Sequence, residues 1–81
     1  MHSREADSLA VSLARRYCKN GEGRRLRLEM LLSAREAARA LNMSVSQISR
    51  WERGLTVPQG ERALAYGRLL GLWLQSREAA R

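Results

Sequence analysis

The sequence has few of the residues from which disulfides, metal sites and catalytic centres are built. Its 81 residues include one cysteine (Cys18), one histidine (His2), one proline and no phenylalanine. A single cysteine excludes an intramolecular disulfide, and a free thiol suits the reducing cytosol. No nucleophile–base pair or metal-ligand spacing appears, so we expect no enzymatic activity, no metal and no other cofactor.

Long apolar runs are absent as well. No stretch approaches the roughly 18 apolar residues that a membrane-spanning helix needs, and no signal peptide is recognisable. We therefore expect a cytoplasmic protein with no membrane partner. The length suits one domain, residues 1–81, with an aliphatic core because aromatic residues make up only 5% of the chain. Without a second domain, we expect no small-molecule ligand.

Acidic residues are scarce relative to basic ones. Eight acids stand against fifteen bases, fourteen of which are arginine, and the formal net charge is +7. A GC-rich genome would explain arginine in place of lysine, but not the excess of bases. Such a charge favours nucleic acid or an anionic membrane surface as partner. The basic run from Arg15 to Arg27 is either solvated or in contact with phosphate.

The N-terminal part of the chain predicts two helices. The first spans about residues 3–20, with Ser3 as its N-cap and Asn20-Gly21 as its stop. The second spans about 22–31, with Leu28 and Leu31 on one face. The alternation of polar and apolar residues at 25–30 also permits a strand, but a lone strand would lack a partner. The expected inward face of the first helix consists of Ala6, Leu9, Ala10, Leu13 and Tyr17.

Two short helices joined by a tight turn are predicted over about residues 34–53. Ser33 and Glu36 have the spacing of a capping box at the start of the first of these helices. Asn42 occupies the turn, where a positive φ is usually required and asparagine tolerates it. Ser44 caps the second of them. Two helices joined so closely must cross steeply.

The C-terminal part begins with a stop and a loop. Gly54 is the expected end of the preceding helix, and Pro58 favours an extended loop before it. The last helix is expected over about 59–79, with Gly71 as a possible break into two pieces. The whole chain is therefore predicted to be all-α, with five or six short helices around one core.

The two short helices have distinct inner and outer faces. Ala38 lies at their crossing, where a small side chain lets the two backbones approach. The wedge between them is expected to be filled by Ala37, Leu41, Met43, Ile48 and Trp51. The side chains left outside are Ser44, Val45, Ser46, Ser49 and Arg50. A helix with such an outer face fits the major groove of DNA.

The stretch "LSAREAARALNMSVSQISRWERGLTVP" resembles the helix-turn-helix of phage repressors and Cro proteins, the XRE-like family of bacterial regulators. The resemblance covers about residues 24–72. It implies a lambda-repressor-like fold and sequence-specific binding of double-stranded DNA, in a small transcriptional regulator of a phage, mobile element or bacterium. It also implies a place at the nucleoid of a bacterial host cell. The helix at residues 3–20 lies outside the minimal family domain.

The resemblance assigns roles to individual residues. The base-edge positions are matched by Val45, Ser46, Ser49 and Arg50. The expected phosphate contacts are Ser44, Arg53, Gln47, Arg39, Arg24 and Arg25. Arg50 is the main specificity candidate because arginine bonds in two places to guanine, and Val45 would pack on a thymine methyl group. Two departures are Ala34, in place of a glutamine that often contacts phosphate, and Asn42, in place of glycine.

Two structural pairings are also expected. The family pattern matches Arg27 to a partner of Glu52, which predicts a partly buried salt bridge. The apolar stretch 69–74 predicts a homodimer with Leu70, Leu72 and Trp73 at its interface, because soluble monomers rarely expose such a patch. The alternative is that the first helix, with Leu9, Leu13 and Tyr17, folds back and covers this patch.

Two other functions stay open at the level of sequence. One is a DNA-bending excision factor for a recombinase, which would bend its site without repressing a promoter. The other is an antitoxin or other protein-interaction module, which a mobility shift with competitor DNA would separate from both DNA-binding functions.

Overall fold

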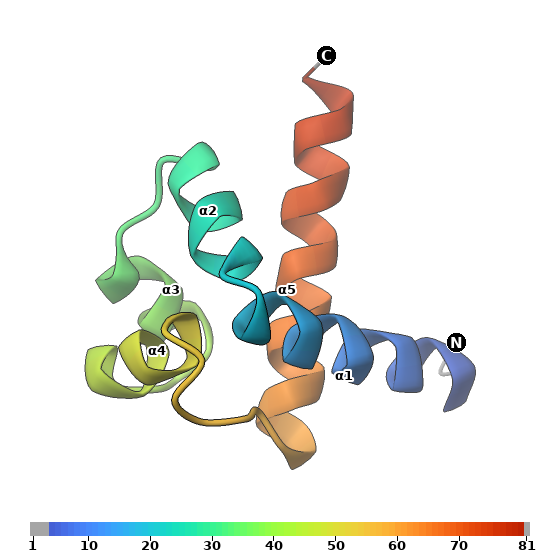
Figure 1. Cartoon of the computed structure of the whole chain (residues 1–81). Coiled ribbons are helices and arrows are strands. Elements are labelled where there is room, and N and C mark those ends of the chain that lie inside the picture. Colours follow the sequence, from blue (N-terminus) through green and yellow to red (C-terminus); the bar gives the residue numbers. More distant parts are fainter. Residues whose placement is uncertain (1–3, 81) are drawn as a thin grey trace.

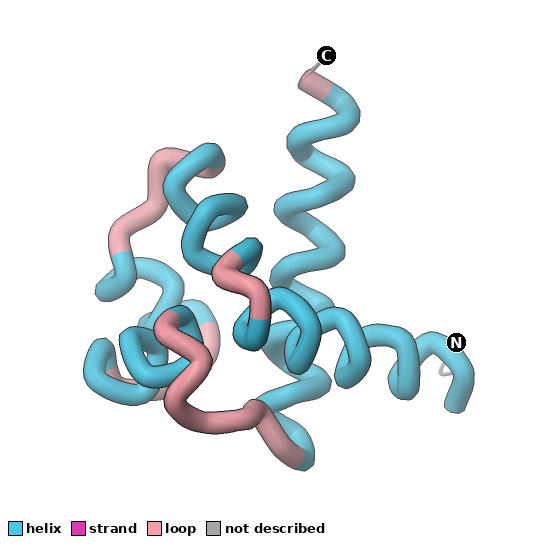
Figure 2. Tube along the Cα trace, in the orientation of Figure 1, coloured by secondary structure: helices cyan, strands magenta, loops and turns pink. Residues whose placement is uncertain are grey.

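The computed structural model describes residues 4–80, which form five α-helices around one core (Figures 1 and 2). The helices are α1 (Arg4–Lys19), α2 (Glu22–Glu29), α3 (Ala34–Ala40), α4 (Val45–Glu52) and α5 (Gly60–Ala79). Residues 4–80 contain no strand, so the strand alternative at 25–30 is wrong. The expected cap Ser3 and the histidine His2 lie outside the described residues. Within residues 4–80, no helix combines the length and the apolar character needed to cross a membrane.

The long helix α5 is continuous through Gly71, so the predicted break at this residue is wrong. An isolated glycine inside a helix costs only about 1 kcal/mol relative to alanine, which packing along the rest of α5 offsets. Figure 1 shows α1 crossing the N-terminal half of α5, while α2, α3 and α4 lie to one side of α5. At the crossing, a Cβ atom on Gly67 would lie 1.8 Å from the carbonyl oxygen of Ala10, so only glycine permits this approach.

The core contains aliphatic side chains around one aromatic pair. The rings of Trp51 and Tyr66 stack with their centroids 5.0 Å apart and their planes at 26°. Leu26, Ile48 and Leu70, one each from α2, α4 and α5, are fully buried in the same core cluster. The core thus joins the two-helix unit α3–α4 to the rest of the domain.

The inward face of α1 differs from the expected one. Leu9 and Ala6 are exposed, whereas Ala14 and Cys18 are buried. The reason is that α1 extends past α5 at its N-terminal end, so only its second half lies over the core (Figure 1). Leu28 and Leu31 of the second predicted helix are exposed as well, because Leu26 takes the buried position on α2.

The helix pair α3–α4 and the turn within it have the predicted local geometry. Ser33 and Glu36 form a capping box, in which the Glu36 amide donates to Ser33 Oγ and the Ser33 amide donates to Glu36 Oε1, each at 3.0 Å. Asn42 has a φ of 54°, the positive value expected for the turn. Ala38 is buried at the crossing of the two helices. Local sequence signals therefore place α4 with its polar side facing outward.

Candidate nucleic-acid interface

The outer face of α4 is the candidate recognition surface. Val45, Ser46 and Arg50 are exposed, and Ser49 is half-buried. On the opposite side of the helix, Ile48 and Trp51 are buried in the core. The helix is therefore held from behind, while a basic and largely small-residue surface is left free for a partner. All four expected base-contact residues lie on this surface or at its edge.

The start of α4 is fixed by a second capping box. The Gln47 amide donates to Ser44 Oγ at 3.2 Å, and the Ser44 amide donates to Gln47 Oε1 at 3.0 Å. The Ser44 hydroxyl also lies 3.3 Å from Gln47 Oε1, to which it donates. Because the Ser44 hydroxyl is already engaged in hydrogen bonds with Gln47, the Gln47 side-chain NH2 group is the better placed of the two to donate to a phosphate.

A buried ion pair sets the end of α4 against α2. Arg27 Nε and Nη2 donate to the two carboxylate oxygens of Glu52, at 2.6 and 2.9 Å. Arg27 Nη1 donates to the Leu32 carbonyl oxygen at 2.8 Å. The hydrogen bonds that Arg27 donates to the Glu52 carboxylate raise the pKa of Arg27 above its ordinary value, so the guanidinium stays charged despite its burial. One arginine thus connects α2, the turn before α3 and the end of α4.

The remaining phosphate candidates are all exposed but lie on three different elements. Arg53 follows α4 directly, and its Nε is 3.4 Å from the Ser49 carbonyl oxygen. Arg39 is on α3, and Arg24 and Arg25 are on α2. Arg25 forms an ion pair with Glu22, which partly neutralises it. Of these two arginines on α2, Arg24 is therefore the one whose charge is more available to a phosphate.

A groove beside α4 contains two residues that the sequence analysis did not single out. It has a volume of about 370 Å³, with Gln47 and Arg50 on the α4 side and Gln59 and Arg62 on the α5 side. The sequence contains no clear sign that Gln59 and Arg62 belong to this groove, because nothing in their spacing relates them to α4. Only the tertiary fold, which places the start of α5 across this groove from α4, brings the two arginines together.

The expected dimer surface is mostly part of the core. Leu70 and Trp73 are buried, and only Leu72 of the three residues is exposed. Leu70 and Trp73 belong to the same core cluster as Leu13 and Tyr17 of α1. The alternative, that the first helix covers this stretch, therefore explains why Leu70 and Trp73 are buried. Leu9, however, is exposed and does not contribute to the covering surface.

Comparison with known families identifies the chain. The model of a family described as helix-turn-helix matches residues 24–72, more than half of the chain. The chain belongs to this family of DNA-binding regulators, which confirms the resemblance and the all-α, lambda-repressor-like fold class. The family is generally non-enzymatic. Comparisons with curated proteins and with solved structures gave no match.

Proposed function

We propose that this chain is a sequence-specific transcriptional regulator of the repressor or Cro type, from a phage, mobile element or bacterium. The observation that supports this function is the exposed face of α4, with Val45, Ser46 and Arg50 outward and the opposite side buried. In this proposal α4 enters the major groove of double-stranded DNA, where Arg50 bonds to guanine and Val45 contacts a thymine methyl group.

The phosphate contacts in this proposal come from both sides of the recognition helix. Gln47 and Arg53 lie at its two ends, and Arg39 and Arg24 are exposed on the neighbouring helices. Such contacts hold the protein in register on the duplex without reading sequence. The family membership favours this function over a protein-interaction module, and the outer face of α4 is exposed as this function requires.

We further propose that the protein binds as a homodimer to two half-sites about 34 Å apart, one turn of DNA. Leu72, exposed on α5, is the residue of the originally expected interface that remains available for a second copy. Two linked half-sites would raise the affinity of a small domain that buries limited surface on each half-site.

Selection of bound duplexes from random DNA is the direct test. We expect one enriched motif, with repeated half-sites if the dimer forms. On the selected duplex, the logarithm of affinity should fall with the logarithm of salt concentration with a slope of roughly −4 to −5 per subunit, if about five arginines neutralise phosphates. No enriched motif, together with a slope near zero, would rule out DNA as the main partner.

A further inference from the structure

Helix α1 lies outside the residues that the family model matches, yet it packs against the loop that follows the recognition helix. Arg15 Nε donates to the carbonyl oxygen of Pro58 at 3.2 Å. A Cβ atom on Gly54 would lie 3.5 Å from the carbonyl oxygen of Cys18, so the end of α1 is in close contact with the end of α4. The additional helix therefore forms one wall of the surface next to α4.

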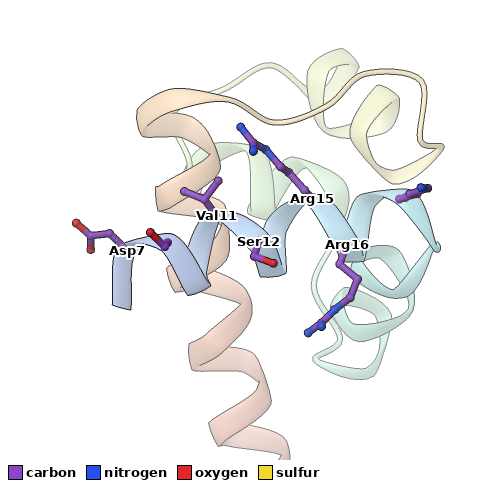
Figure 3. A pocket seen from close by; sticks show the side chains of 7 residues that line it. Asp7, Val11, Ser12, Arg15 and Arg16 are labelled. Atoms are coloured by element: carbon purple, nitrogen blue, oxygen red, sulfur yellow. The ribbon is translucent and has the colours of Figure 1, made fainter. Parts of the chain in front are cut away.

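Between α1 and this loop lies a groove with a volume of about 320 Å³. Arg15 and Lys19 line it from α1, and Gly54 and Thr56 line it from the loop. Arg15 and Lys19 are four residues apart, which places them on the same side of the helix. Figure 3 shows a second pocket, which lies along α1 and is lined by Arg15, Arg16 and Lys19 among others; in this view Arg15 extends toward the loop, whereas Arg16 extends to the other side of α1. The groove thus receives two basic side chains and a hydroxyl group.

The groove is continuous with the candidate interface. Thr56 and Val57 line both this groove and the one that contains Arg50 and Arg62. The loop is therefore a ridge, with one pair of basic residues on each side. A DNA strand that crosses this ridge beside α4 would meet both pairs.

The local charge of the groove is positive. The sequence has no acidic residue at 8–19 or at 53–60. Of the acids that flank these segments in the chain, Glu52 pairs with Arg27, Asp7 with Arg68 and Glu22 with Arg25, and Glu61 does not line the groove. Within residues 4–80, neither Arg15 nor Lys19 forms an ion pair, and the bond to Pro58 engages only one nitrogen of the Arg15 guanidinium. Both side chains therefore keep donors for an anion.

We propose that Arg15 and Lys19 bind a phosphate of the DNA backbone next to the end of the recognition helix, so that α1 is an additional DNA-contacting element. This inference rests on the proposed function. The competing explanation is that basic residues in the last turn of α1 only complement its C-terminal dipole. Arg16 is also in the last turn of α1 but does not line the groove between α1 and the loop, which makes it the matched control.

The test compares Lys19→Ala with Arg16→Ala on the selected duplex and on random duplex, by fluorescence anisotropy over a range of salt concentrations. Lys19→Ala should weaken binding to both duplexes equally, by about 3- to 8-fold at 0.1 M salt, and should reduce the salt slope by about 0.9. Arg16→Ala should change affinity by less than about 2-fold. Lys19→Met, which keeps most of the apolar stem, should behave like Lys19→Ala.

Phosphate ethylation interference supplies a second readout. One phosphate whose ethylation weakens the unmutated protein should lose that effect in Lys19→Ala and keep it in Arg16→Ala. Equal losses for Lys19→Ala and Arg16→Ala, or an unchanged salt slope, would overturn the role of α1 while leaving the proposed function in place. Absence of DNA binding by the unmutated chain would instead reject both proposals.

Discussion

Arg27 on α2 and Glu52 on α4 form a two-point ion pair, with their side chains only 8% and 6% exposed. Both charges are therefore removed from water, and each depends on the other to offset that cost. Because the pair joins α2 to the last residue of the recognition helix, it fixes the orientation of α4 relative to the rest of the domain. The same arginine also satisfies the Leu32 carbonyl oxygen.

Removing one member of this pair should cost more than removing both. Arg27→Met or Glu52→Gln alone should lower the free energy of unfolding by about 3–5 kcal/mol, because the remaining partner is left buried without its counter-charge. The double variant should lose less than the worse single variant. Urea denaturation of the four proteins gives a double-mutant cycle, and additive losses would mean that the two residues do not interact energetically.

Arg50 should determine specificity rather than general affinity. Arg50→Ala is expected to cost about 1–3 kcal/mol on the selected duplex and to relax the preference at one base pair, because the arginine would lose its two bonds to guanine. Binding to random duplex should change much less. Mobility-shift titrations on both duplexes check this, and equal losses on the two would assign Arg50 to a phosphate instead.

The parts of the fold that sequence alone predicted correctly depend on short-range spacing. The capping box at Ser33 and Glu36, the positive φ of Asn42 and the glycine stop at Gly54 after α4 each depend on a few neighbouring residues. These signals define α3 and α4 and therefore the outward face of the recognition helix. The Arg27–Glu52 pair joins two helices that are far apart in the sequence, so short-range spacing could not predict it. Only the family pattern predicts it.

The incorrect predictions concern how the helices cross. Periodicity gives α1 an apolar stripe, but it does not say that the stripe ends where α1 passes α5, which leaves Leu9 exposed. Likewise, an apolar stretch does not reveal which of its residues other helices cover, so Trp73 was assigned to an interface when it belongs to the core. The groove with Arg62 was missed for the same reason.

Two glycines of α5 should respond in opposite directions to the same substitution. Gly67→Ala should lower the free energy of unfolding by about 1–3 kcal/mol or more, because the new methyl group would collide with the backbone of Ala10. Gly71→Ala should raise it by about 0.5–1 kcal/mol, because a Cβ atom there meets nothing within 4 Å and alanine favours helix. Thermal unfolding of the two variants is the measurement. A stable Gly67→Ala protein would show that α1 does not cross α5 so closely.

Cys18 should make the protein sensitive to alkaline pH. Burial, with a smaller contribution from Glu52, raises the pKa of this thiol from 9.0 to about 12. The unfolded chain therefore loses its thiol proton at lower pH than the folded chain does. The free energy of unfolding should fall as the pH rises from about 9 to about 12, and Cys18→Ala should remove this part of the fall. Urea denaturation at several pH values checks the prediction. Equal pH dependence of the two proteins would contradict it.

Leu72 tests whether the protein self-associates through α5. Leu72 is 62% exposed, so Leu72→Glu should leave the monomer folded, whereas Trp73→Glu should unfold it because Trp73 is part of the core. If two copies meet at Leu72, the glutamate would place a charge in their contact. Leu72→Glu should then sediment as a monomer at concentrations where the unmutated chain is dimeric, and it should bind the repeated half-sites more weakly.

Leu55 provides the matched control for this experiment, because it is 63% exposed and lies in the loop after α4 rather than on α5. Leu55→Glu removes an equally exposed leucine and adds the same charge, so it should leave the sedimentation of the protein unchanged. Sedimentation equilibrium over a wide concentration range compares the three proteins. If the unmutated chain is monomeric throughout and each molecule occupies one unrepeated site, the homodimer is wrong and α4 reads a single half-site.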